Sequence, residues 1–170
     1  DYRPFLAFSD IDIVIIATYA DSHLPILEDC LAAGKHVLCE KPLAPTPEQI
    51  QEMFACAKEN GVLLMEAFAY LHSPLMAAIK KEIQSGVIGD VLYLESQFIT
   101  SDYDISNIRM RKENFGGATY DLGCYTTSQI LWLTEEDPIK VQAVADFSDH
   151  GIDTYTSGLL TFADGKKATF

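Results

Sequence analysis

Three short apolar runs, separated by two amphipathic stretches, constrain the fold of this chain more than any other feature. The runs cover residues 11–18, 36–40 and 62–68 and are rich in Ile, Val and Leu. Short apolar runs of this kind are typical of buried parallel strands, and the stretches between them have the spacing of helices. With short connections and right-handed crossovers, the alternation predicts a doubly wound parallel sheet.

The helix expected after residue 45 has well-defined ends. Thr46 is predicted to be its N-cap, Pro47 lies in the first turn, and Gln49 is placed to close a capping box. Gly61 follows the last apolar position and is predicted to end the helix. The helix before it is expected to end at Gly34.

The pattern changes after residue 72. Ser73 and Pro74 open a further helix, for which the spacing predicts an inward face. That face is expected to consist of Leu75, Ile79 and Ile83. Beyond it, alternating strands are predicted from residue 91 and at 141–147, 159–162 and 167–170, with a hairpin turn at residues 163–166. Alternation of this kind indicates a mainly antiparallel sheet.

We therefore predict an α/β chain with two domains. Residues 1–72 are expected to form part of a Rossmann dinucleotide-binding domain, the C-terminal half of its parallel sheet. Residues 73–170 are expected to form part of an α+β substrate and oligomerisation domain with a mainly antiparallel sheet. Because the pattern begins halfway through a doubly wound sheet and stops inside a strand, we expect a middle segment of a longer protein, truncated at both ends.

Composition excludes several classes of partner. The formal charge of −13 disfavours nucleic acid and anionic membranes, since phosphate binding needs clustered Lys and Arg. An apolar share of 48% supports a packed core. The four cysteines and four histidines show no metal-ligand spacing, so we expect reduced core thiols, no metal site and no disulfide framework. With no signal peptide and no apolar run long enough to span a bilayer, a cytoplasmic protein is expected.

Two separate pieces of the sequence carry candidate chemistry. Glu40 and Lys41 follow an apolar strand, and ligands of open α/β sheets bind outside such strand ends. Asp121 and Tyr125, one helical turn apart, follow a Gly-Gly pair. Taken alone, each piece also has a structural explanation: a lysine at a turn, and an aspartate favoured near a helix N-terminus. Gly123 likewise indicates either close approach of the helix to a ligand or tight packing on the sheet.

Taken together in this order, the motifs resemble the Gfo/Idh/MocA oxidoreductase family. The resemblance rests on Ala-Gly-Lys-His-Val-Leu-Cys-Glu-Lys-Pro-Leu at 33–43 and on Gly-Gly-Ala-Thr-Tyr-Asp-Leu-Gly-Cys-Tyr at 116–125, and it covers essentially the whole chain. Residues 65–68 resemble the dihydrodiol dehydrogenase branch most closely. Tyr125 does so too, because many other members of the family have histidine at its position. The family implies a Rossmann domain that binds NAD or NADP, followed by a domain with a large antiparallel sheet.

The resemblance also implies roles for individual residues. Those matched to the catalytic positions are Lys41, Asp121 and Tyr125. Those matched to cofactor-binding positions are Ala17, Thr18, Tyr19, His23, Glu40, Lys41 and Arg109. No G-x-G-x-x-G phosphate loop occurs in the chain, so we expect this segment alone to bind dinucleotide weakly and to be inactive.

The implied activity is hydride transfer between nicotinamide and a carbon of a sugar, polyol or cyclic diol. Such a reaction needs a proton donor for the oxygen, and a nearby ammonium makes a tyrosine a better donor because it stabilises the phenolate. We expect Lys41, Asp121 and Tyr125 to face one cleft, and the full-length protein to be a homo-oligomer. The alternative is a non-catalytic binding or assembly module related to the same family.

Overall fold

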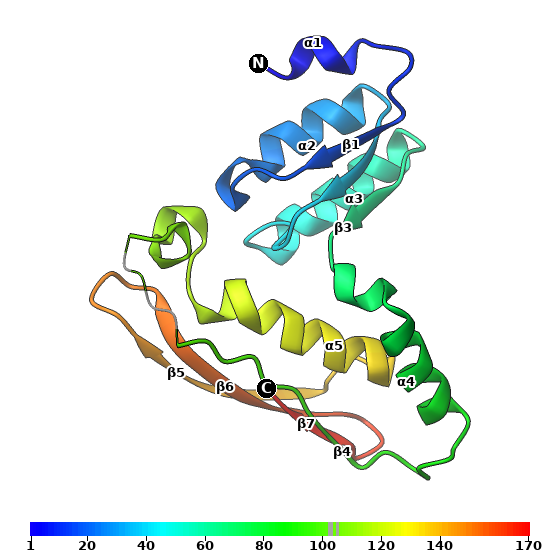
Figure 1. Cartoon of the computed structure of the whole chain (residues 1–170), viewed down its shortest axis with the longest axis vertical. Helices are drawn as coiled ribbons and strands as arrows, with labels where there is room; N and C mark the ends of the chain where they lie inside the picture. The colour runs from blue at the N-terminus through cyan, green and yellow to red at the C-terminus, as the bar shows by residue number, and fades with distance from the viewer. Residues whose placement is uncertain (102–103, 105) are drawn as a thin grey trace. The chain divides into compact units, whose positions relative to one another are not determined.

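The computed structural model describes residues 1–101, 104 and 106–170, and its elements divide into two compact units. The first comprises Asp1–Ala67 with Glu113–Phe115, and the second comprises Phe68–Lys112 with Gly116–Phe170. Figure 1 traces the whole chain in its order of elements. Each unit has its own sheet and its own apolar cluster.

The first unit contains a parallel sheet of three strands among the described residues, as predicted. Its elements are α1 (Arg3–Leu6), β1 (Ile13–Ile16), η1 (Ala20–Ser22), α2 (His23–Ala32), β2 (His36–Cys39), α3 (Pro47–Glu59) and β3 (Leu64–Glu66). The strand order is β1-β2-β3, with Ile16 opposite Cys39 and Cys39 opposite Glu66. The parallel register brings the carboxyl ends of all three strands to one edge of the sheet.

Helices α2 and α3 pack on the same face of this sheet. Leu27 and Leu31 of α2 and Met53 of α3 are buried in one cluster with Ile16 and Val37 of the strands. The opposite face of β1 carries apolar side chains that are well exposed, with Ile13 at 59% and Ile15 at 68%. The strand is therefore apolar on both faces, as predicted, and within the described residues only one face is covered.

The helix boundaries follow the predicted capping residues in part. The Thr46 hydroxyl accepts a hydrogen bond from the Gln49 amide at 3.3 Å, as expected of the N-cap of α3. In the loop before this helix, the Lys41–Pro42 peptide bond is cis. The second half of the predicted capping box is wrong, because the buried Gln49 Oε1 has no hydrogen-bond partner among the described residues. Gly34 and Gly61 have positive φ angles of 71° and 66°, as expected of helix-ending glycines.

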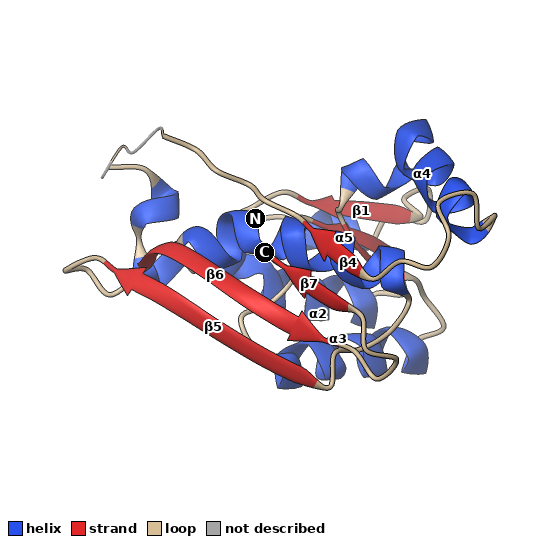
Figure 2. Ribbon diagram, turned by 90° about the horizontal axis from the view of Figure 1, so that it is seen from below, coloured by secondary structure: helices blue, strands red, loops and turns tan. Residues whose placement is uncertain are grey.

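The second unit places helices on one side of a mainly antiparallel sheet. Its elements are η2 (Ala69–His72), α4 (Pro74–Gln84), β4 (Tyr93–Glu95), η3 (Ile108–Met110), η4 (Lys112–Asn114, whose last two residues belong to the first unit), the π-helical turn η5 (Thr119–Gly123), α5 (Cys124–Thr134), β5 (Lys140–Phe147), β6 (Asp153–Thr161) and β7 (Lys167–Thr169). The strand order is β4-β7-β6-β5, which Figure 2 shows side by side. Pairing is antiparallel except between β4 and β7.

The turn between β6 and β7 confirms the predicted hairpin. The Phe162 amide donates to the Lys166 carbonyl at 3.0 Å, and Gly165 has a φ of 93°. Helix α5 runs along one face of the sheet (Figure 1), with Ile130 packed against Leu160 and Phe162. The sheet of the second unit is therefore mainly antiparallel, as predicted, although β6 begins at Asp153, ahead of the strand predicted at 159–162.

The predicted inward face of α4 is wrong at two of its three positions, because only Ile83 is partly buried. Leu75 is 68% exposed and Ile79 is 36% exposed, whereas Met76 is only 5% exposed. The contacts of α4 with α5 explain the difference: Gln129 Nε2 lies 3.8 Å from Met76 Sδ, and Lys80 Nζ lies 4.3 Å from the centre of the Trp132 ring. The less exposed stripe of α4 therefore runs through Met76, Lys80 and Ile83, and the contacts with α5 select it.

No helix in the described part of the chain is long and apolar enough to cross a membrane.

Candidate active site

The loops that follow β1 and β2 lie next to each other at the carboxyl edge of the parallel sheet. The Glu40 amide donates to the Ile16 carbonyl at 2.8 Å, which fixes the start of the Lys41 loop beside the end of β1. Of the predicted cofactor-binding residues, Ala17, Thr18 and Tyr19 leave β1 at this edge, and Glu40 and Lys41 leave β2 there. The structure thus brings these five residues to the edge where open α/β sheets bind ligands.

His23, the first residue of α2, joins these two loops. Its side chain is buried, and its Nδ1 lies 3.1 Å from the Pro42 carbonyl oxygen while its Nε2 lies 3.2 Å from the Thr18 carbonyl oxygen. Both ring nitrogens therefore face backbone acceptors, one in each loop. The ring therefore clamps the Thr18 loop to the Lys41 loop, because one nitrogen faces each of them. The predicted contact of His23 with a cofactor stays a prediction.

Glu66 is a residue at this edge to which the sequence analysis gave no role. It ends β3 opposite Cys39, and its Oε1 accepts from the Leu43 amide at 2.8 Å. Burial raises the pKa of the Glu66 carboxyl, against the opposing effects of the Leu43 hydrogen bond and of the charges of His23 and Lys41. The sequence signal was a carboxylate ending an apolar strand, the same signal that singled out Glu40.

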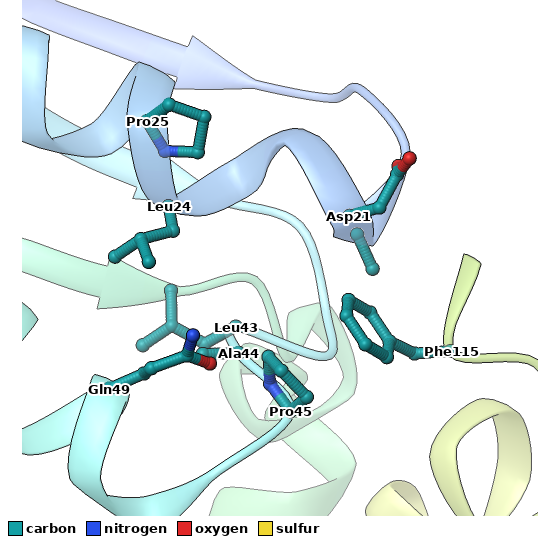
Figure 3. A pocket seen from close by; sticks show the side chains of 9 residues that line it. Asp21, Leu24, Pro25, Leu43, Ala44, Pro45, Gln49 and Phe115 are labelled. Atoms are coloured by element: carbon teal, nitrogen blue, oxygen red, sulfur yellow. The ribbon is translucent and has the colours of Figure 1, made fainter. Parts of the chain in front are cut away.

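A small pocket lies beside the two loops within the first unit (Figure 3). It has a volume of about 110 Å³. The residues that line it include Leu24 and Pro25 of α2, Leu43 and Pro45 of the loop between β2 and α3, and Phe115. Ligand pockets for drug-sized molecules have roughly 300–1,000 Å³, so this hollow is too small for a dinucleotide. The candidate site is therefore the open edge of the sheet and not this pocket.

In the second unit, the Gly-Gly turn holds the Arg109 segment against the start of a helix. The Gly117 amide donates to the Arg109 carbonyl at 2.8 Å, and the Gly116 amide donates to the Arg111 carbonyl at 2.9 Å. A Cβ atom at Gly116 would overlap the Arg109 carbonyl and lie 2.8 Å from the Arg111 carbonyl oxygen. Only glycine allows this close approach, which explains why the motif is needed at this point of the chain.

The turn brings two predicted site residues together. Arg109 Nε donates to Asp121 Oδ1 at 3.1 Å, and the Asp121 side chain is 21% exposed while that of Arg109 is 58% exposed. Arg109 was matched to a cofactor-binding position, and that assignment stays a prediction. The structure adds that the Arg109 guanidinium pairs with the carboxylate matched to substrate contact.

Tyr125 lies one helical turn after Asp121, within an aromatic cluster. The centre of its ring is 5.7 Å from that of Phe68, 5.8 Å from that of Tyr70 and 5.7 Å from that of Phe98. The Tyr70 hydroxyl lies 2.8 Å from Ser128 Oγ, and burial raises the pKa of the Tyr70 phenol. These contacts hold the Tyr125 ring between two segments, residues 68–70 at the start of η2 and Phe98 after β4.

The structure therefore assembles the predicted site residues in two groups. Lys41 belongs to the first unit, and Arg109, Asp121 and Tyr125 belong to the second. That Lys41 faces the other group stays a prediction. In the described residues, no group of three or more His, Cys, Asp or Glu side chains is arranged to hold a metal ion.

Comparison with known proteins identifies the family. Residues 1–68 match the model described as an oxidoreductase family with an NAD-binding Rossmann fold, and residues 76–170 match the GFO/IDH/MocA C-terminal domain. The chain belongs to the Gfo/Idh/MocA family. Both family models match in the order that the motifs predicted.

Individual members of the Gfo/Idh/MocA family are similar along nearly the whole chain. A trans-1,2-dihydrobenzene-1,2-diol dehydrogenase of Mus musculus is 34% identical over 172 residues, covering 99% of this chain and 51% of that protein. The crystal structure of aldose-aldose oxidoreductase from Caulobacter crescentus complexed with glycerol has a TM-score of 0.92 at 28% identity, over 99% of this chain and 52% of that one. Levoglucosan dehydrogenase, in complex with NADH and levoglucosan, has a TM-score of 0.84 at 28% identity, over 99% of this chain and 49% of that one. The chain spans about half the length of the curated relatives it matches.

Proposed function

We propose that the protein is an NAD(P)-dependent oxidoreductase that interconverts an alcohol and a carbonyl on a sugar, polyol or cyclic diol. The observation that carries the proposal is the place of Lys41, directly after a parallel strand at the edge of a sheet that matches the NAD-binding family model. Matched relatives bear the names of dehydrogenases, reductases and oxidoreductases, and none of them supports the non-catalytic alternative.

The residues at the sheet edge fit the nicotinamide end of such a cofactor. The backbone from Ala17 to Tyr19 and the Glu40–Lys41 segment are held at that edge by the Glu40 hydrogen bond and by the His23 clamp. Parallel strand ends of this kind are where dinucleotides bind in doubly wound sheets. NAD or NADP, when bound, supplies the hydride acceptor or donor. We assign Lys41 and Arg109 to cofactor binding, to which each contributes a positive charge.

The chain's own residues supply proton transfer and substrate orientation. We assign Tyr125 as the acid that gives its hydroxyl proton to the substrate oxygen in the reducing direction and accepts a proton in the oxidising direction. Asp121 accepts a hydrogen bond from a substrate hydroxyl, while the hydrogen bond from Arg109 orients its carboxylate. Lys41 stabilises the phenolate left on Tyr125 after proton release.

The family name covers many substrates, and the relatives indicate the class. Trans-1,2-dihydrobenzene-1,2-diol dehydrogenase and D-xylose 1-dehydrogenase are named for a cyclic diol and an aldose. The aromatic cluster around Tyr125 suits the apolar face of a ring that also carries hydroxyl groups. We therefore propose a cyclic, carbohydrate-like substrate.

Incubation of the full-length protein with NAD⁺ or NADP⁺ and a panel of aldoses, cyclic polyols and cyclic diols tests the proposal. Formation of reduced nicotinamide, followed by absorbance, is expected with at least one class. Lys41→Met should lower turnover by about 10²-fold or more, whereas Lys58→Met, which changes an exposed lysine of α3, should leave it unchanged. No reduced nicotinamide from any class with either cofactor would contradict the proposed function.

We also propose that the protein forms a homo-oligomer through the sheet of the second unit. The face of this sheet opposite α5 carries apolar side chains that are largely exposed, among them Val144 at 68%, Tyr155 at 55% and Tyr93 at 52%. Exposed apolar patches of this kind mark interaction surfaces. Sedimentation at micromolar concentration should give at least a dimer, and a monomer would count against this assignment.

A further inference from the structure

A buried carboxylate outside the residues discussed so far is fully engaged at the start of β6. The side chain of Asp153 is largely buried, with the residue 9% exposed. Its Oδ2 accepts from the Thr119 amide at 2.7 Å, from the Thr119 hydroxyl at 2.6 Å and from the Thr156 hydroxyl at 2.8 Å. A carboxylate taken out of water is costly unless it is hydrogen-bonded, so these three bonds indicate a specific placement.

The Thr119 amide lies in the first turn of a helical segment, where backbone amides have no acceptor within the helix itself. Thr119 begins η5, which continues without interruption into α5. Asp153 therefore caps this segment from a distant strand, and a negative charge at a helix start is favourable. Asp121 lies two residues and Tyr125 six residues after Thr119, so both lie within the first two turns of the segment that Asp153 holds.

The same carboxylate lies against the Gly-Gly turn that hydrogen-bonds to the Arg109 carbonyl. A Cβ atom at Gly117 would overlap Asp153 Oδ1 and would lie 3.2 Å from its Cγ. Gly117 has a φ of 116° and donates to the Arg109 carbonyl at 2.8 Å. Asp153 thus contacts both the Gly-Gly turn, which holds the backbone of Arg109, and the helix start, which carries Asp121 and Tyr125.

We infer that Asp153 is a positioning residue for the reaction proposed above, fixing the Arg109–Asp121 pair and Tyr125 relative to each other. The inference rests on the proposed function. Asp153 acts through the backbone of Thr119 and Gly117 and not by contact with substrate. Because a misplacement of about 1 Å can cost roughly 10²-fold in rate, a rigid helix start has a direct effect on turnover.

The test uses Asp153→Ala and Asp153→Asn in the full-length protein. Asp153→Ala removes all three hydrogen bonds and should lower kcat by about 10–10²-fold. Asp153→Asn keeps an oxygen acceptor for Thr119 and should recover part of kcat. The control is Glu136→Gln, which removes a carboxylate of the same unit that pairs with Lys166 Nζ at 2.8 Å, and which should leave kcat unchanged.

Two further readouts separate positioning from general stability. The deuterium isotope effect on hydride transfer should increase in Asp153→Ala, because the chemical step becomes slower relative to the other steps. Hydrogen exchange should show lost protection for the amides of residues 119–125, while the amides of β5 and β6 keep theirs. The second readout needs no turnover, so an inactive wild-type protein would contradict the proposed function without affecting the test of Asp153.

An Asp153→Ala protein with wild-type kcat and an unchanged isotope effect would overturn the inference. So would an activity loss accompanied by an unchanged isotope effect and by protection lost evenly through the second unit, because that pattern describes unfolding. Failure of Asp153→Asn to recover any activity over Asp153→Ala, with both folded, would also contradict the assigned hydrogen bonds.

Discussion

The Arg109 guanidinium and the Asp121 carboxylate meet at 3.1 Å between Nε and Oδ1. The contact joins a residue of η3 to a residue of η5 twelve positions later, and the Gly-Gly turn between them makes the approach possible. An exposed pair of this kind contributes little to stability. The pair instead orients the Asp121 carboxylate, which we propose accepts a hydrogen bond from a substrate hydroxyl.

The first prediction concerns this pair. Arg109→Gln should change the free energy of unfolding by less than about 1 kcal/mol, because the Arg109 side chain is 58% exposed. It should raise the KM for substrate several-fold, because Asp121 loses the partner that orients it. A double-mutant cycle with Asp121→Asn in kcat/KM should show coupling between the two sites. Additive effects in that cycle would contradict a shared role.

The second prediction contrasts two glycines of the motif. Gly116→Ala should destabilise the fold by about 1–3 kcal/mol, because its Cβ meets the backbone of Arg109 and Arg111. Gly123→Ala should stabilise it by up to about 1 kcal/mol, because the nearest atoms to a Cβ there lie at an ordinary 3.6 Å. Melting temperatures of both variants check the signs. Destabilisation by Gly123→Ala would show that tight packing requires this glycine.

Gly123→Ala also separates the two explanations of that glycine. Within the second unit, packing leaves room for a methyl group. If the glycine is instead needed for close approach to substrate, the variant should melt at a higher temperature and yet have a raised KM. A more stable variant with wild-type KM would exclude that explanation as well.

The third prediction concerns pH and Glu66. Burial raises the pKa of this carboxyl in the folded protein above its ordinary value of 4.5. At a pH between 4.5 and the folded-state pKa, the folded protein holds a proton that the unfolded chain releases. The stability that this group contributes is full below pH 4.5 and is lost as the pH rises through the folded pKa. Glu66→Gln keeps an acceptor for the Leu43 amide and removes this loss.

Thermal unfolding of Glu66→Gln and wild type at acidic and neutral pH checks this prediction. The variant should gain stability relative to wild type as the pH rises from about 4 to about 7. Titrations common to both proteins cancel in the difference. An identical difference at both pH values would contradict a raised pKa at Glu66.

The fourth prediction concerns the cysteines. Burial, with the charges of Glu66 and Glu40 adding to it, raises the pKa of the Cys39 thiol to about 12. Since the thiolate is the reactive form, iodoacetamide should alkylate Cys39 at least about 100-fold more slowly than the partly exposed Cys56 in the native protein. Peptide mass spectrometry over time measures both rates. Equal rates would contradict a buried, unreactive Cys39.

Local patterns were sufficient for much of the fold. The three parallel strands follow from continuous apolar runs, and Thr46 and Ser73 are the N-caps that their positions indicated. Where packing against a second element decides which side chains are buried, the sequence pattern was insufficient. Met76 and not Leu75 is buried in α4, because α5 contacts only one stripe of that helix.

The site shows the same division. Lys41, Asp121 and Tyr125 stand in motifs, so their place along the chain could be predicted from the sequence. Glu66 and Asp153 act through hydrogen bonds to residues 23 and 34 positions away, and no local pattern marks such contacts. The remaining prediction tests the motif residue with the most direct chemical role.

That residue is Tyr125, and Tyr125→Phe in the full-length protein tests its proposed role as the proton donor. The substitution keeps the ring packed against Phe68, Tyr70 and Phe98 and removes only the hydroxyl. Loss of general acid catalysis should lower kcat by about 10²–10⁴-fold, with cofactor affinity little changed. Tyr93→Phe, which removes a hydroxyl on the sheet, serves as the control and should keep wild-type kcat.

The decisive measurement is kcat of Tyr125→Phe, Tyr93→Phe and wild type as a function of pH. We expect a large loss for Tyr125→Phe alone at every pH at which the wild-type protein turns over. A Tyr125→Phe enzyme with near-normal kcat across that range would exclude the tyrosine as the proton donor and leave Lys41 as the better candidate.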